Sequence, residues 1–167
     1  MGPGISLRSA EACDLDRLGA LKLESSLAWG DHAEALKALP EARIVQPGHL
    51  PFITLAEQAG EIAGFVTVIA DGAEGRAVLE DLFVAPAAWR KGIGAQLLTE
   101  AERRARAWGA THLWLVANER AQPFYEAHGF RFVERVETEL GSAAVLQKPL
   151  SPLPGGRLDI VIDNDGC

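Results

Sequence analysis

The sequence is poor in cysteine and tyrosine and has no long hydrophobic run. Its two cysteines, Cys13 and Cys167, lie far apart with no metal-site spacing. This argues against a disulfide framework and predicts a cytoplasmic protein. No segment approaches the roughly 20 apolar residues of a membrane-spanning helix, and the N-terminus lacks the apolar run of a signal peptide. No membrane partner is therefore expected.

Positive charge is also scarce: 16 lysines and arginines stand against 23 acidic residues, for a formal net charge of -7. Nucleic-acid binding needs a basic surface that neutralises phosphates, so no nucleic-acid partner is expected. An acidic surface attracts cationic amines, or it serves only solubility. The four histidines do not cluster in the sequence, and no metal site is predicted.

Length and hydrophobic pattern predict one domain over residues 1–150, followed by a tail at 151–167 of unknown role, rich in proline, glycine and aspartate. The expected fold class is α/β (α+β), with a mixed, mostly antiparallel central sheet flanked by helices. Periodicity and turn signals predict the elements as follows. Strands are expected at 5–8, 52–57, 61–70, 76–84, 111–116, 130–139 and 143–148, and helices at 14–29, 31–39, 92–108 and 120–128.

Two details of this pattern are specific enough to test. Asp31 is the expected cap of the second helix, and 41–51 is expected to be a loop. In the strand at 76–84, simple alternation places Val78, Glu80, Leu82 and Val84 on one face and Leu79, Asp81 and Phe83 on the other. Apolar residues on both faces predict a central strand.

The strongest local signal is the segment WRKGIGAQLL, Trp89 to Leu98, where a strand ends and an amphipathic helix begins after two glycines. Glycine allows a ligand to approach the backbone, and the free N–H groups of a helix start attract phosphate. Arg90 and Lys91 add positive charge. The same pattern fits a tight strand–helix turn. The segment lacks the third glycine of a dinucleotide fingerprint and the GK[ST] of a P-loop, which disfavours a nucleotide-binding domain.

The segment Leu79 to Ala101 resembles the acetyl-CoA motif of the GNAT N-acetyltransferases, a V-x-P on a strand followed by R/Q-x-x-G-x-G/A. Here Val84-Ala85-Pro86 precedes Trp89 to Gly94, with Trp89 where the family usually has arginine or glutamine. Asn118 to Phe130 resembles a second family motif in the expected order. The resemblance implies a GNAT-like fold and direct transfer of an acetyl group from acetyl-CoA to a primary amine of a small molecule or peptide, without a metal.

The resemblance also implies positions for the cosubstrate and the acceptor. The N-terminal helices, 14–39, and the final hairpin would border the amine, and the protein would be a monomer or homodimer. The expected cofactor-binding residues are the backbone of Leu82, Phe83 and Val84 for pantetheine, the turn of Arg90, Lys91, Gly92, Ile93, Gly94 and Ala95 for pyrophosphate, and Asn118, Phe124 and Tyr125 nearby.

Tyr125 and Glu80 are the expected catalytic residues. Tyr125, the sole tyrosine, matches the position of the family's general acid. A phenol with a pKa of about 10 can protonate a leaving thiolate. The helical spacing of Tyr125 also fits a residue that only packs in the core. In that case His128 is an alternative proton donor to the thiolate. Glu80 would take the amine proton through a water, unless it is simply solvated and the amine loses its proton to bulk water. A non-catalytic acyl-CoA-binding module is the alternative function.

Overall fold

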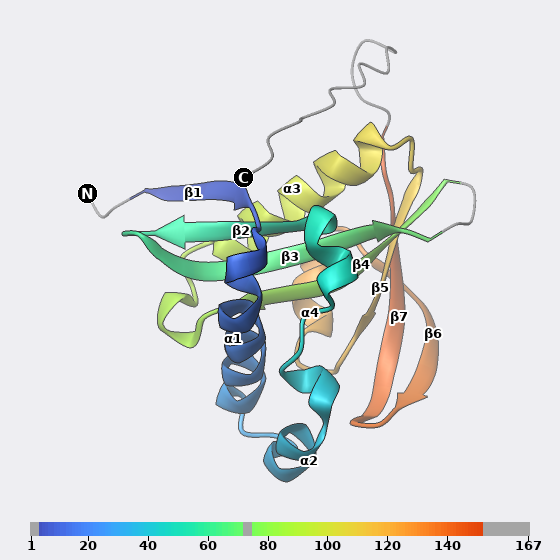
Figure 1. Cartoon of the computed structure of the whole chain (residues 1–167). Coiled ribbons are helices and arrows are strands. Elements are labelled where there is room, and N and C mark those ends of the chain that lie inside the picture. Colours follow the sequence, from blue (N-terminus) through green and yellow to red (C-terminus); the bar gives the residue numbers. More distant parts are fainter. Residues whose placement is uncertain (1–3, 72–74, 152–167) are drawn as a thin grey trace.

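The computed structural model describes residues 4–71 and 75–151, and within them the chain forms one seven-stranded sheet with helices on both faces (Figure 1). The strand order is β1-β2-β3-β4-β5-β7-β6, and every neighbouring pair is antiparallel except β4 and β5. This confirms the predicted mixed, mostly antiparallel sheet. The strands are β1 (Ile5–Ser9), β2 (Ile53–Gln58), β3 (Glu61–Ala70), β4 (Arg76–Val84), β5 (His112–Ala117), β6 (Arg131–Thr138) and β7 (Gly141–Pro149).

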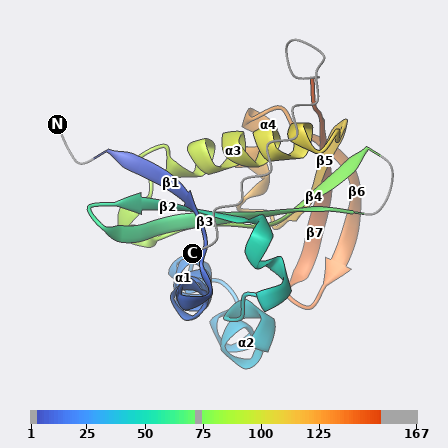
Figure 2. The same ribbon diagram turned by 45° about the horizontal axis from the view of Figure 1, so that its top comes forward.

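The helices divide between the two faces of the sheet. They are α1 (Leu15–Ala28), α2 (Ala33–Ala38), α3 (Ile93–Ala107) and α4 (Gln122–Ala127). Figure 2 shows α3 and α4 on one face and α1 and α2 on the other. On the α3 face, Leu97 and Leu98 are buried against the sheet, and on the α1 face Leu18 and Leu21 are buried with Phe65. Burying each such side chain stabilises the fold by roughly 1.5–3 kcal/mol.

Local sequence explains most element boundaries. Ala59 and Gly60 both have positive φ angles, +54° and +81°, as the two-residue turn of a β2–β3 hairpin requires. Gly92 starts α3 and Gly109 follows its end, with φ angles of +78° and +85° that suit glycine. The Gly141 position, at φ +103°, closes the β6–β7 hairpin.

Two expectations near α2 were wrong. The residue before α2 is His32, in a left-handed conformation with φ +55° and no side-chain cap, because Asp31 instead forms an ion pair with Arg120. The segment expected to be a loop contains turns of 3-10 helix at Pro40–Ala42 and Pro47–Phe52. The proline at the start of each turn supplies a suitable φ angle. Of the predicted tail, residues 152–167 lie outside the described residues.

A bulge in β4 overturns the simple alternation expected for that strand. Thr67 of β3 pairs with Asp81 and the next residue pairs with Leu79, so Glu80 is an extra residue in β4. Leu79 therefore packs in the same core as Leu82 and Val84, on the α3 face. The sequence pattern misassigned Leu79 because an inserted residue reverses the facing of every side chain beyond it.

No helix among the described residues is long and apolar enough to cross a membrane.

Candidate functional site

The centre of the sheet is split between β4 and β5. These parallel strands pair only at Arg76–His112, Ala77–Leu113 and Val78–Trp114. Beyond that point, β4 continues to Val84 along β3, while β5 continues to Ala117 along β7. In the described part of the chain, the β5-facing edge of β4 over its last residues therefore has no strand partner, and an extended ligand can pair with such an edge. The predicted pantetheine-binding residues, Leu82, Phe83 and Val84, lie on this stretch.

The turn after β4 presents the start of α3 beside this split. Gly92 is the N-cap residue and provides no side-chain hydrogen bond to the helix. The N–H groups of the first helical turn, at Ile93, Gly94 and Ala95, thus keep the positive end of the helix dipole uncapped. Arg90 and Lys91 are exposed, and neither forms an ion pair within residues 4–71 and 75–151. The turn therefore combines backbone donors with two available cations, a combination that suits an anion.

Three predicted cofactor-binding residues from different elements converge at this turn. A Cβ atom built on Gly94 would lie 3.6 Å from the Phe124 ring and 3.8 Å from a methyl group of Val84. The start of α3, the end of β4 and the middle of α4 thus meet around one glycine. Any larger residue at Gly94 would occupy space between these groups.

Tyr125 of α4 is buried, with 7% of its surface exposed, and its ring makes edge contacts with Phe124 and Phe130. Burial, and secondly the negative charge of Asp81, raise the pKa of the phenol above its ordinary value. The hydroxyl therefore stays protonated across the neutral range and holds its proton more tightly than an exposed phenol does. The same burial makes Tyr125 part of the core, so packing and proton donation are compatible.

Glu80 and Asp81 are adjacent carboxylates in different surroundings. Glu80 is exposed at the bulge, and its side chain forms no ion pair with another described residue. Asp81 is largely buried and pairs with Lys22 of α1 at 3.5 Å. The Glu80 carboxylate is thus open to solvent, whereas the Asp81 carboxylate is paired with a lysine within the fold. The Asp81–Lys22 pair had no signal in the sequence, because its two residues lie on elements far apart in the chain.

The polar residues of the second motif are used mainly within the chain. The Oδ1 atom of Asn118 accepts a hydrogen bond from the backbone N–H of Ala121 at 2.9 Å, which shapes the turn before α4. The Nδ1 atom of His128 donates to the carbonyl oxygen of Phe124 at 2.7 Å, and the two rings lie 4.4 Å apart. Asn118 keeps its NH₂ group for a ligand, and His128 keeps Nε2.

Sequence reasoning missed a cluster at the end of β4. The carbonyl oxygen of Val84 accepts hydrogen bonds from the Trp89 indole at 2.7 Å and from the Ser25 hydroxyl at 2.9 Å. The Trp89 ring stacks on Trp29 at the end of α1. The contacts made by Ser25 and Trp29 connect segments about sixty residues apart in the sequence, so no local pattern could reveal them.

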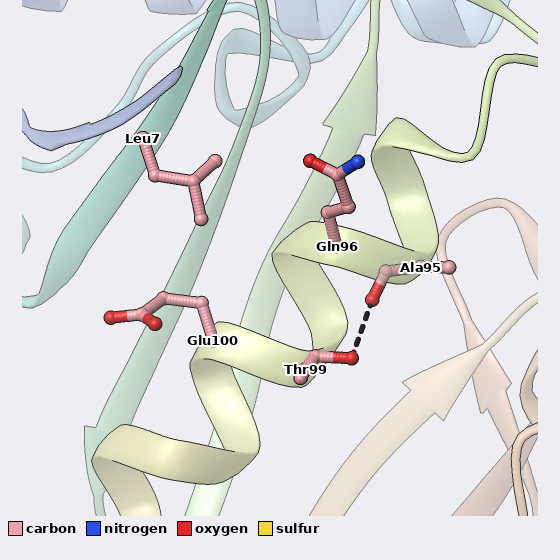
Figure 3. Close-up of a pocket in the computed structure, with 5 residues that line it drawn as sticks. All are labelled: Leu7, Ala95, Gln96, Thr99 and Glu100. Carbon is pink, nitrogen blue, oxygen red and sulfur yellow. Dashed lines mark hydrogen bonds between the residues drawn. The ribbon is translucent and has the colours of Figure 1, made fainter. Parts of the chain in front are cut away.

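A cavity of about 360 Å³ lies between β1 and α3 and begins at Ala95, the last residue of the expected pyrophosphate turn (Figure 3). It is lined by Leu7, Ala95, Gln96, Thr99 and Glu100. The Thr99 hydroxyl donates to the Ala95 carbonyl oxygen at 2.9 Å, and Glu100 is bound by Arg103. Because this lining has no basic side chain, the cavity does not suit a phosphate group.

Over the described ranges, no group of three or more histidine, cysteine, aspartate or glutamate side chains is arranged to hold a metal ion.

Curated N-acetyltransferases match parts of this sequence. The chain is 38% identical over 81 residues to the peptidyl-lysine N-acetyltransferase YiaC of Escherichia coli (strain K12), covering 47% of this chain and 49% of that protein. It is 42% identical over 76 residues to the streptothricin acetyltransferase of Streptomyces lavendulae, covering 44% and 40%. The chain thus spans about half the length or less of these two curated relatives.

Among solved structures, the PaiA N-acetyltransferase from Thermoplasma acidophilum, crystallised in complex with coenzyme A, shares the fold. Its TM-score is 0.72 at 23% identity, covering 87% of this chain and 99% of that one. Residues 18–130, more than half of the chain, match the family model described as the acetyltransferase (GNAT) family. The resemblance expected from the two sequence motifs is therefore confirmed, and the chain belongs to the GNAT acetyltransferase family.

Proposed function

We propose that the protein is an N-acetyltransferase that moves an acetyl group directly from acetyl-CoA to a primary amine. The observation that carries this proposal is the convergence of Gly94, Phe124 and Val84 beside the unpaired edge of β4. An uncapped helix start at this point suits the pyrophosphate, and an open strand edge suits the amide groups of pantetheine. Membership of the GNAT family supports both assignments.

The chemistry assigns one proton transfer to each of two side chains. The neutral amine nitrogen attacks the thioester carbonyl carbon, a C–N bond forms, and the C–S bond then breaks. Glu80, exposed at the bulge, takes the surplus amine proton through a water. Tyr125 gives its proton to the departing thiolate and regains one from solvent. A phenol is protonated at neutral pH, and the raised pKa of Tyr125 makes it a weaker acid than an exposed tyrosine.

The acceptor enters from the side of α1, α2 and the β6–β7 turn in this proposal. A cavity of about 160 Å³ lies between α2 and that turn. It is lined by Ala35, Ala38, Leu39, Glu139 and Leu140, four apolar side chains and one carboxylate. This lining suits an aliphatic chain that carries a positive charge. The names of the two relatives make a peptidyl lysine and streptothricin the first acceptors to test.

The test is release of free coenzyme A from acetyl-CoA in the presence of an amine panel, with the acetylated product identified by mass spectrometry. The panel holds lysine peptides, streptothricin, polyamines and amino acids. Acetylation of any member supports transfer. Tight coenzyme A binding without acetylation of any amine identifies an acyl-CoA-binding module instead, and absence of coenzyme A binding contradicts the proposed site altogether.

A further inference from the structure

Two tryptophans from distant segments stack on the rim of the candidate site. Trp29 follows the last residue of α1, and Trp89 lies in the turn between β4 and α3. Their ring centroids are 4.7 Å apart and their planes differ by 26°. Trp29 is 46% exposed, so solvent still reaches one side of the pair. The pair thus connects a helix on the α1 face to the turn that leads into the helix on the opposite face (Figure 2).

α1 contacts the end of β4 in a second way. The carbonyl oxygen of Val84 accepts a hydrogen bond from the Ser25 hydroxyl of α1 at 2.9 Å and another from the Trp89 indole at 2.7 Å. Trp89 is therefore held by its ring face and by its N–H group at once. The ring contact comes from the end of α1 and the N–H contact from the end of β4, so Trp89 is held by both elements.

The turn that Trp89 begins has an unfavourable backbone. Arg90 has a φ angle of +66°, a left-handed conformation that is uncommon for residues other than glycine, and Gly92 follows at +78°. Such conformations persist when surrounding contacts hold them in place. Trp89 is the residue immediately before Arg90, and its stack and hydrogen bond are the side-chain contacts that hold this end of the turn.

The segment after β5 reaches the same stack from the other side of the split. The Arg120 guanidinium lies 5.6 Å from the Trp29 ring centre and forms an ion pair with Asp31, just beyond α1. The ends of β4 and β5 are therefore both connected to Trp29, by Trp89 and by Arg120 respectively.

We propose that Trp29 and Trp89 are positioning residues for the coenzyme A site. From the α1 side, their stack holds the turn in the conformation that directs the N–H groups of the α3 start toward the pyrophosphate. This inference rests on the proposed function, because it concerns the same site. It assigns a role in coenzyme A affinity to Trp29, a residue of the α1 side rather than of the α3 helix start.

The test measures coenzyme A binding by titration calorimetry in four proteins: the parent, Trp29→Leu, Trp29→Phe and Trp108→Leu. Trp29→Leu removes the stack and is expected to weaken binding about three- to tenfold, the range that one aromatic pair provides. Trp29→Phe keeps an aromatic face and is expected to bind nearly as the parent does. Trp108 is the matched control, because it also follows a helix, is 41% exposed and contacts a single aromatic ring, Phe52.

Steady-state kinetics separate positioning from acceptor binding. In Trp29→Leu the KM for acetyl-CoA is expected to rise, with the acceptor KM and the kcat at saturating acetyl-CoA close to the parent values. A rise confined to the acceptor KM would overturn the inference. Equal loss of affinity in Trp29→Leu and Trp108→Leu would also overturn it, because a general loss of stability would explain both.

The parent measurement distinguishes failure of the inference from failure of the proposed function. If the parent binds no coenzyme A, the proposed site is wrong. If the parent binds and Trp29→Leu binds equally well, the site stands and the positioning role is wrong. Should Trp29→Leu not fold, as judged by thermal unfolding, Trp89→Leu replaces it in the same measurements, and binding equal to that of the parent overturns the inference.

Discussion

Gly94 and Phe124 lie close enough that a Cβ atom on Gly94 would contact the Phe124 ring. A Cβ atom on Gly94 would lie 3.6 Å from the Phe124 ring, an ordinary van der Waals contact, and Gly94 does not have a positive φ angle. A small side chain at this position is therefore compatible with the fold, but it would occupy space that a ligand between the two residues needs. This difference makes Gly94 a site where binding and stability can be separated.

Gly94→Val is expected to weaken coenzyme A binding about tenfold or more. Its methyl groups would occupy the proposed path of the pyrophosphate. Thermal unfolding measures separately what the two methyl groups beyond the Cβ atom cost in stability. Gly48→Val is the control, since a Cβ atom there meets nothing within 4 Å. Calorimetry checks both variants. Parent-like affinity in Gly94→Val would show that the pyrophosphate binds elsewhere.

Tyr125→Phe is expected to bind coenzyme A as the parent does, because the ring contacts with Phe124 and Phe130 remain. If the phenol protonates the leaving thiolate, the rate of the chemical step should fall about 10²–10⁴-fold. Single-turnover kinetics isolate that step from product release. A rate equal to that of the parent would make Tyr125 a packing residue and leave the proton to water or to His128.

The titration of Tyr125 can be observed directly, because it is the sole tyrosine of the chain. Burial and Asp81 raise its pKa, so the phenolate absorbance of the native protein should appear only well above pH 10, whereas the unfolded chain should titrate near about 10. Above that pH the unfolded state releases a proton that the folded state retains, so stability falls as pH rises. Tyr125→Phe should remove this part of the slope. A native midpoint at or below 10 would contradict the assignment.

Glu80→Gln is expected to lower kcat/KM about a hundredfold at neutral pH, near the lower end of the contribution of general acid–base catalysis. Glu61→Gln, at an exposed position at the start of β3, is the control with the same chemical change. If both variants match the parent, the amine loses its proton to bulk water before it binds.

Asp14→Asn tests the link between β1 and α1. Asp14 accepts two hydrogen bonds from Arg8, at 2.9 and 3.1 Å, and one from the backbone of Glu11. The Arg8 hydrogen bonds lower the pKa of Asp14, so its stabilisation is complete above about pH 4 and is lost as pH falls. The variant should lose on the order of 1–3 kcal/mol of unfolding free energy at pH 7 and much less near pH 2. Urea unfolding at the two pH values measures the difference, and an equal loss at both would contradict it.

The positions of most helices and strands could be predicted from local sequence, and β3 is an example. Its apolar, β-branched run is bounded by a turn at Ala59-Gly60 and by Asp71, and the observed strand, Glu61–Ala70, has the predicted limits. The bulge at Glu80 escaped prediction because apolar residues occupy both faces of β4, so the pattern fits either phase. Periodicity carries no information about an inserted residue in such a strand.

The candidate site also contains some contacts that the sequence predicted and others that it did not. Val84, Gly94 and Phe124 belong to two motifs that are readable in the sequence, and the fold brings them together. Trp29 lies outside both motifs and Arg120 lies within the second, and their contact depends on how α1 packs against the sheet. Contacts of this kind arise from tertiary packing and have no signature within a window of neighbouring residues.

The short junction between β4 and β5 also affects the mechanics of the sheet. Three residue pairs join these two strands, whereas six join β5 to β7. In backbone hydrogen bonding, the weakest seam of the sheet thus runs through its middle, between a four-stranded half and a three-stranded half. A force that pulls the strands apart sideways would open this seam before the edges. A molecule bound along β4 would bridge the two halves, so the stiffness of the sheet would rise and fall with occupancy of the cleft.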